Sequence, residues 1–414
     1  MAAKFDINEG FNGDVKTIAI QADGKILIGG YFTSYAGSGN TFNYIVRLKS
    51  NGGIDNTFNI GTGFDNTLTT IAIQSDDKIL IGGMFSNYNG ITANRIIRLN
   101  PNGSVDTTFV TGTGFEYDNG TGYDNWVYSI AIQSDGKILV GGYLFKYNGI
   151  TIGRDLVRLN SDGSVDNTFV TGTGFDEFAN GIYSIAIQSS GKILVGGRFS
   201  EYKDITVGKN IIRLNPNGSV DTTFITGTGT TSDTFVFGIA IQSDGKILLC
   251  GDFYNYNGTS SRYLVRLNSD GSIDNTFAYS FNGQKIYAIA IQSDGKILIG
   301  GQFTKDIIRL NPDSTVDNTF AIGAGFNDLV WTMAIQTDGK ILVGGAFRIF
   351  DMMLVSCMIR LNSDGSSDNT INQKQTITTT RLWTKVGYVP GATYTDYEIT
   401  LQEQQILELQ QLGI

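Results

Sequence analysis

Short runs of apolar residues, separated by polar turns, recur along almost the whole chain. Residues 129–140 read Ser-Ile-Ala-Ile-Gln-Ser-Asp-Gly-Lys-Ile-Leu-Val, with Asp135-Gly136 between two apolar runs. Asp-Gly at this place is a strong β-hairpin signal, because a type I′ turn needs positive φ at both central residues. The second run is apolar at consecutive positions, which predicts a strand covered on both faces. The pair Gly141-Gly142, which follows, predicts a bulge or a close backbone approach.

The second half of the same segment predicts two more strands. Residues 156–159 (Leu-Val-Arg-Leu) form a third run, and residues 160–164 (Asn-Ser-Asp-Gly-Ser) have the composition of a turn. Residues 165–169 then predict a fourth, shorter strand. The segment is therefore expected to form a four-stranded antiparallel unit.

This segment recurs seven times, and its marker glutamines are 53, 59, 55, 54, 50 and 44 residues apart. Periods of about 20–50 residues indicate solenoids, propellers or arrays. Helical solenoids are excluded because no repeat holds a useful helix-period segment. A parallel β-helix fits less well, since its rungs are shorter and do not need Asp-Gly hairpins. We therefore predict an all-β fold, a seven-bladed β-propeller with four-stranded blades. The marker glutamines are Gln21, Gln74, Gln133, Gln188, Gln242, Gln292 and Gln336.

Two half-motifs carry a resemblance to a known family. They are Ile-Ala-Ile-Gln-Ser-Asp-Gly-Lys-Ile-Leu-Val-Gly-Gly and Arg-Leu-Asn-x-Asp-Gly-Ser-x-Asp-x-Thr-Phe. Over about residues 5–371 the chain resembles the delta-sixty β-propeller repeat family. The resemblance implies a propeller of the kind found mostly in exported bacterial proteins and in some phage-associated proteins, without a general catalytic motif. The chain departs from exported members because its first residues, MAAKFDINEGF, show no secretory signal.

The repeat divides the chain into a propeller over residues 1–371 and a tail over residues 372–414. The tail does not match the repeat, and its last part predicts a short helix with an apolar face. Such a helix is too short to be stable alone, so we expect it to dock, with a neighbouring subunit as the favoured partner. The apolar residues of this docking tail are Leu401, Ile406, Leu407, Leu409 and Leu412.

Composition removes several classes of function. The 414 residues include no histidine, which excludes Ser-His-Asp and Cys-His catalysis and His-ligated zinc. The two cysteines, Cys250 and Cys357, are too few for a metal cluster or a disulfide framework. A net charge of −9 argues against nucleic acid as the main partner. No apolar run reaches about 18 residues, so no membrane insertion is expected. We expect no cofactor.

Four sets of residues are candidates for chemistry. The repeated Asn-x-Asp-Gly-Ser-x-Asp segments faintly resemble calcium loops, but turn chemistry explains them equally well and is favoured. The arginine of each Arg-Leu-Asn is expected to pair with or cap a neighbouring blade, and the lysine of each Lys-Ile-Leu to be a solvated strand end. The loop 111–128 combines aromatic rings with carboxylates, which suits sugar or protein contact as well as simple packing. Its candidate binding residues are Tyr117, Tyr123, Asp124 and Trp126.

These observations favour a non-enzymatic structural or binding protein. The most consistent setting is a phage particle or a similar extracellular assembly, where the chain contacts other protein subunits or a host surface. The alternative is a bacterial cell-surface or secreted adhesion module that binds a glycan. A glycan-active enzyme is the least favoured, because most aspartates stand at repeated turn positions rather than in a visible catalytic pair.

Overall fold

The computed structural model describes residues 10–35, 41–116, 125–176, 181–231, 233–279 and 283–368. Its contacts divide the chain into two compact units, Met1–Asp368 and Asn369–Ile414. The predicted tail helix lies outside the described residues, which contain strands, turns and bridges but no helix. Among these residues no helix has the length and apolar character to cross a membrane.

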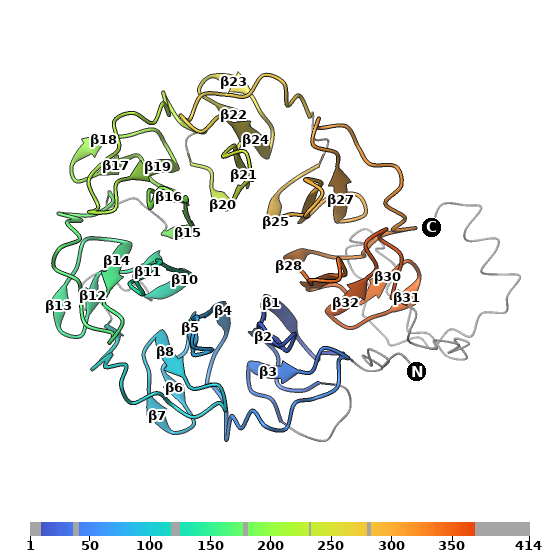
Figure 1. Ribbon diagram of the computed structural model, residues 1–414, viewed down its shortest axis with the longest axis horizontal. Coiled ribbons are helices and arrows are strands. Elements are labelled where there is room, and N and C mark those ends of the chain that lie inside the picture. The colour runs from blue at the N-terminus through green and yellow to red at the C-terminus, as the bar shows by residue number, and fades with distance from the viewer. Residues whose placement is uncertain are drawn as a thin grey trace, which may run out of the picture. The chain divides into compact units, whose positions relative to one another are not determined.

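The first unit is a β-propeller with seven blades around one axis (Figure 1). Each blade is an antiparallel sheet of three strands. The inner strands are β1 (Asp14–Ile20), β4 (Leu68–Ile73), β10 (Trp126–Ile132), β15 (Ile182–Ile187), β20 (Val236–Ile241), β25 (Ile286–Ile291) and β28 (Val330–Ile335). The middle strands are β2 (Ile26–Tyr31), β5 (Ile79–Gly83), β11 (Ile138–Tyr143), β16 (Ile193–Gly197), β21 (Ile247–Gly251), β26 (Ile297–Gly301) and β29 (Ile341–Gly345). The outer strands are β3 (Ile45–Leu48), β8 (Ile96–Leu99), β14 (Leu156–Leu159), β19 (Ile211–Leu214), β24 (Leu264–Leu267), β27 (Ile307–Leu310) and β32 (Met358–Leu361).

The fourth strand of each blade is reduced to one bridging residue. In blade three, Leu159 pairs with Val165 as an isolated bridge, and the six other blades have the equivalent pair. The chain then turns instead of extending, because the backbone N–H of Phe169 donates to the carbonyl of Asp166 at 3.1 Å. The predicted fourth, shorter strand over residues 165–169 is therefore a single bridge, while the seven-bladed propeller is confirmed.

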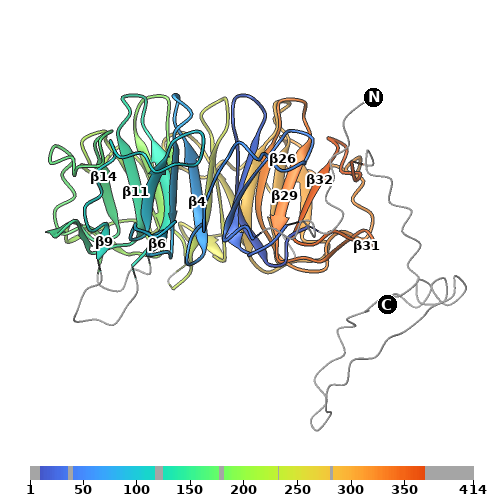
Figure 2. The same cartoon turned by 90° about the horizontal axis from the view of Figure 1, so that it is seen from below.

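Short hairpins lie at the periphery of several blades, and Figure 2 shows β6, β9 and β31 near one edge of the blades. They belong to blades two, three, four, five and seven. Their strands are β6 (Asn87–Tyr88), β7 (Ile91–Thr92), β9 (Phe115–Glu116), β12 (Lys146–Tyr147), β13 (Ile150–Thr151), β17 (Glu201–Tyr202), β18 (Ile205–Thr206), β22 (Asn255–Tyr256), β23 (Thr259–Ser260), β30 (Ile349–Phe350) and β31 (Met353–Leu354).

The core lies between blades, as the doubly apolar strands predict. Ile138, Leu139 and Val140 of β11 are all fully buried, so this strand is covered on both faces. The inner strand β1 packs against both β4 and β28, which closes the ring. At the closure, Arg348 of blade seven donates to the backbone carbonyls of Phe11 and Asn12, at 2.8 and 3.1 Å.

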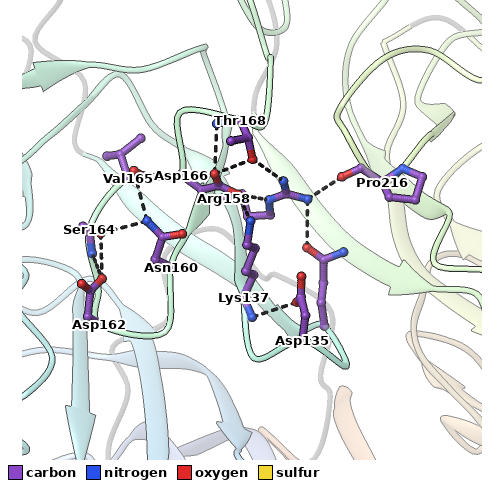
Figure 3. Close-up of polar contacts among 11 residues, drawn as sticks. Asp135, Lys137, Arg158, Asn160, Asp162, Ser164, Val165, Asp166, Thr168 and Pro216 are labelled. Atoms are coloured by element: carbon purple, nitrogen blue, oxygen red, sulfur yellow. Dashed lines mark hydrogen bonds and ion pairs between the residues drawn. The ribbon is translucent and has the colours of Figure 1, made fainter.

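The recurring arginine links each blade to the next (Figure 3). In blade three, Arg158 Nε donates to Asp166 Oδ2 at 2.7 Å, and Nη1 donates to the carbonyl of Pro216 in blade four. The same carbonyl contact is repeated around the ring, and Arg360 of blade seven donates to Ser50 of blade one at 2.7 Å. The predicted structural role of the arginine is therefore confirmed, and the partner is the turn of the following blade. The seven arginines are Arg47, Arg98, Arg158, Arg213, Arg266, Arg309 and Arg360.

The sequence predicted that the recurring lysine is a solvated strand end, and the structure contradicts this prediction. Lys137 Nζ lies 2.8 Å from Asp166 Oδ2, so the buried carboxylate is shared between Lys137 and Arg158. Every blade has an equivalent lysine–aspartate pair, from Lys25–Asp55 at 3.9 Å to Lys340–Asp368 at 2.9 Å. The prediction was wrong because the aspartate follows the lysine by 21 to 30 positions and only the blade fold brings the two together.

Candidate functional site

A β-bulge recurs in the inner strand of every blade. In β10, pairing with β11 shifts between Val127 and Ser129, so Tyr128 is left without a partner residue. Opposite this shift, a Cβ on Gly142 would lie 1.9 Å from the carbonyl oxygen of Trp126, so only glycine fits there. The glycine pair therefore accompanies both a bulge and a close backbone approach, as predicted. Bulges re-aim a side chain relative to a regular strand.

The bulged residues of blades three to seven are all aromatic, and their rings form a continuous arc of contacts. Tyr128 and Tyr183 are stacked with centroids 4.5 Å apart, and Tyr183 contacts Phe237 at 5.5 Å. Phe237 contacts Tyr287 at 5.0 Å, and Tyr287 contacts Trp331 at 4.5 Å. Because these residues lie on inner strands, the arc runs around the propeller axis. We call these five residues the axial aromatic arc.

Two further rings extend the arc on one side. Trp126 lies edge-on to Tyr128 at 5.9 Å, and Phe235 is stacked parallel to Phe237 at 5.4 Å. The guanidinium of Arg198 lies 5.6 Å from the centre of the Phe235 ring. Apolar ring faces and cationic groups thus occur together at this end of the inner strands.

Blades one and two complete the circle with polar residues. Lys16 Nζ lies 3.7 Å from the centre of the Trp331 ring and 3.0 Å from the Asp14 carboxylate. Burial lowers the pKa of Lys16, and the hydrogen bond with Asp14 opposes that shift. In blade two, the bulged residue Thr69 donates its hydroxyl to the carbonyl of Val127. The circle therefore has an aromatic sector and a smaller polar sector.

The polar atoms of the arc are neutral hydrogen-bonding groups. Burial raises the pKa of Tyr128, Tyr183 and Tyr287, so the three phenols stay protonated at neutral pH. The indole Nε1 of Trp331 is buried, and no group in the described part of the chain accepts a hydrogen bond from it. A buried donor without a partner is costly unless a ligand or water satisfies it.

The structure places only one of the predicted binding residues. Trp126 joins the arc through Tyr128, whereas the other three lie outside the described residues. The described ends of their loop are joined, because the Asn125 side chain donates to the carbonyl of Glu116. The tail residues predicted to dock also lie outside the described residues. These unplaced residues are Tyr117, Tyr123, Asp124, Leu401, Ile406, Leu407, Leu409 and Leu412.

The other residues of the arc were missed by sequence reasoning, although a signal was present. In every repeat the bulged residue stands five positions before the marker glutamine, and this position is aromatic in five consecutive repeats. The seven residues at this position are Lys16, Thr69, Tyr128, Tyr183, Phe237, Tyr287 and Trp331.

The repeated Asx turns use their own carboxylate oxygens. Asp162 Oδ1 accepts from the backbone N–H and the hydroxyl of Ser164, at 2.9 and 2.7 Å. These hydrogen bonds are the ones expected of an Asx turn, the interpretation that the sequence favoured over a calcium loop. Across the described residues, no group of three or more Cys, Asp or Glu side chains is placed to hold a metal ion.

Comparisons with known proteins agree with this architecture. A family model described as "Domain of unknown function (DUF5122) beta-propeller" matches residues 21–58, 74–109, 133–169, 188–224, 242–277, 292–320 and 336–370. No curated protein sequence matches the chain.

Solved structures share the fold at low sequence identity. One is the extracellular domain of a one-component system of B. thetaiotaomicron, at a TM-score of 0.52 and 17% identity, over 84% of this chain and 39% of that chain. A second, from a hybrid two-component system of the same organism, has a TM-score of 0.51 and 16% identity, over 95% of this chain and 44% of that chain. A streptogramin B lyase has a TM-score of 0.51 and 16% identity, over 84% of this chain and 94% of that chain. The chain thus spans less than half the length of the two extracellular domains.

Proposed function

Because the chain belongs to the DUF5122 beta-propeller family, whose description assigns no function, we propose a role from its own geometry. The protein is a non-enzymatic binding module of an extracellular assembly, and it binds a surface glycan through the axial aromatic arc. The extracellular domains among the structural neighbours support this location for the fold.

The arc is the observation that carries the proposal. Five aromatic side chains from five different blades form one contact series, which no single strand could build. Aromatic faces bind the apolar faces of sugar rings, while phenol, indole and ammonium groups bind hydroxyls. Lys16 Nζ supplies such a donor beside the Trp331 ring. The arrangement of apolar faces with a few polar groups is that of a binding site with defined orientation.

The assembly that we propose is a phage particle or a similar structure, in which other protein subunits hold the propeller and the arc meets the host surface. The half-motifs resemble the delta-sixty repeat, and this resemblance supports the proposed phage setting because that family includes phage-associated proteins. The second candidate is a secreted or cell-surface adhesion module. The arc favours glycan binding in both settings, so images of the protein in its native context distinguish them.

Binding to immobilised bacterial surface polysaccharides tests the proposal directly. The full chain is expected to bind at least one polysaccharide in a panel, and Trp331→Ala and Tyr287→Ala are each expected to weaken that binding by about tenfold or more. Tyr254→Ala is the matched control, because Tyr254 is 49% exposed and contacts Tyr263 away from the arc. Thermal melting establishes that each variant is folded.

Two results would overturn the proposal. One is a panel without any binding, and the other is binding that both arc variants retain. The same panel tests the absence of catalysis. Released sugar that disappears when an axial carboxylate such as Asp14 is replaced by asparagine would make the protein an enzyme.

A further inference from the structure

In six of the seven blades, one buried aromatic side chain fills the outer end of the blade. In blade two, Tyr88 is 1% exposed and its hydroxyl donates to the carbonyl of Gly103 at 2.6 Å. The carbonyl acceptor belongs to the turn that follows the outer strand. Four other blades repeat the bond, at 2.8–3.0 Å, and blade seven has Phe350 in this position. The five pairs are Tyr35–Gly52, Tyr88–Gly103, Tyr147–Gly163, Tyr202–Gly218 and Tyr256–Gly271.

Blade six lacks this aromatic residue and has a pocket in the same place. Only residues 302–306 connect β26 to β27, so no peripheral hairpin forms there. A pocket of about 380 Å³ opens at this blade, a size within the range of ligand pockets, about 300–1,000 Å³. It is lined by Tyr279, Phe303, Ile308 and Val316, among other residues.

The pocket wall has the same residue positions as the surroundings of Tyr88. By repeat position, the four lining residues correspond to Ile60, Phe85, Ile97 and Val105, which pack in one cluster with Tyr88. The side chains of the two blades differ in exposure. Phe85 and Ile97 of blade two are buried, whereas Phe303 and Ile308 at the same positions of blade six are partly exposed. Val316 is 40% exposed. Within the described residues, blade six therefore has no counterpart of the Tyr88 side chain.

Charge around the pocket indicates the chemistry of an occupant. Arg309 lines the wall, but its Nε is held by Asp317 Oδ2 at 2.7 Å, so this part of the wall carries a satisfied pair. Lys305 also lines the pocket, is exposed, and has no ion-pair partner among the described carboxylates. The carbonyl of Ser314 stands at the turn position that accepts the tyrosine hydroxyl in blades one to five. The site suits a phenol ring on a loop with a nearby acidic residue.

We propose that the pocket of blade six is a docking site for a partner protein, which inserts a tyrosine from a tight turn flanked by an acidic residue. The inserted ring replaces the missing hairpin and takes the place that Tyr88 takes in blade two. Five copies of the bound arrangement within the same chain support the fit of a tyrosine. This site is at the periphery of the propeller and is independent of the axial aromatic arc.

A cyclic peptide with the sequence of residues 87–92, Asn-Tyr-Asn-Gly-Ile-Thr, with an added aspartate is the probe. It is expected to bind the full chain saturably in calorimetry or by nuclear magnetic resonance. The same peptide with alanine in place of tyrosine is expected to bind about tenfold more weakly or not at all. Val316→Trp should block the pocket and abolish binding. Val110→Trp is its control, because Val110 is an exposed valine outside the pocket.

A graft provides a second, independent measurement. Replacing Thr304-Lys305 with the blade-two hairpin 87–92 fills the pocket from within. The graft is expected to raise the melting temperature by about 2 °C or more and to abolish peptide binding. The proposal is overturned if the peptide does not bind the native chain, or if binding survives Val316→Trp. It is also overturned if Val316→Trp dissolves a dimer of the chain, since the occupant would then be a second copy.

Discussion

Gly238 lies directly opposite Cys250 in the pairing of β20 with β21. Here the small residue stands on the inner strand and the larger one on the middle strand, the reverse of the other blades. In blade three the same two positions hold Ser129 and Gly141, with the glycine on the middle strand. A Cβ on Gly238 would lie 2.7 Å from the sulfur of Cys250, so the glycine makes room for the cysteine. The cysteine side chain therefore fits on the middle strand only because the inner-strand residue opposite it is glycine.

This exchange predicts strong coupling between the two positions. Gly238→Ser alone is expected to destabilise the protein by about 1–3 kcal/mol, because the new side chain clashes with the buried sulfur. Cys250→Gly alone should also destabilise, because it leaves a void. The double variant restores the serine–glycine pair of blade three and should recover most of the loss. Chemical denaturation of all four proteins measures the coupling, and additive losses would contradict the prediction.

The turn at Asp77 offers a stabilising substitution. Asp77 has φ of 61° where six other repeats have glycine, and a left-handed conformation costs a residue with a Cβ roughly 1–2 kcal/mol, less for aspartate than for most residues. Asp77→Gly is therefore expected to raise the melting temperature. The reverse change at the matched position, Gly136→Asp, should lower it, since Gly136 has φ of 82°. A fall in the melting temperature of Asp77→Gly would refute the strain argument.

The shared carboxylates predict loss of stability in acid. Burial alone would raise the pKa of Asp166, but hydrogen bonds from Lys137, Thr168 and Arg158 outweigh it and lower this pKa. A carboxylate with a lowered folded pKa stabilises the fold above its unfolded pKa, about 3.9, and this stability is lost as the pH falls towards the folded pKa. Melting temperatures measured from pH 7 to pH 2 should therefore fall steeply below about pH 4.

A variant of this carboxylate isolates its contribution. Asp166→Asn should be clearly less stable than the native chain at pH 7, because it leaves Arg158 buried without its carboxylate partner. The difference in melting temperature between Asp166→Asn and the native chain should become smaller as the pH falls below about 4. A constant gap across the pH range would mean that Asp166 is not the titrating group.

The tail should be dispensable for the propeller. The ring is closed by residues up to Asp368, through Arg360 to the Ser50 carbonyl and through Arg348 to Phe11. A chain truncated after Ile371 is therefore expected to remain β-rich and to melt cooperatively, but to lose the self-assembly or partner binding of the full chain. Circular dichroism and sedimentation measure the two properties. A truncated chain that does not fold would place part of residues 372–414 in the structural core, and one that assembles normally would disprove the docking role.

Features that depend on a few neighbouring residues were predictable from the amino-acid sequence. Asp135-Gly136 indicates a hairpin turn, and the hairpin forms between β10 and β11. The expected type I′ turn is wrong, because Gly136 has φ of 82° but Asp135 does not have positive φ. The apolar run at Ile138 indicates a buried strand because its period matches that of a strand covered on both faces. Seven repetitions of such local signals determined the propeller. The aromatic residue Trp126 was also visible as a candidate for binding.

Features that join distant residues were decided by the tertiary structure alone. Arg158 and the Pro216 carbonyl are 58 positions apart, and Tyr287 and Trp331 come from successive blades, yet each pair is in contact. The sequence pattern has no information on which neighbour a side chain meets, because the bulge aims the ring and closure of the propeller brings the inner strands together. The pocket at Phe303 likewise became visible only in the structure, because six other blades bury an aromatic side chain at this place and the β26–β27 connection of blade six supplies none there. The sequence by itself determined the repeated blade, and the closed ring decided which side chains of different blades meet.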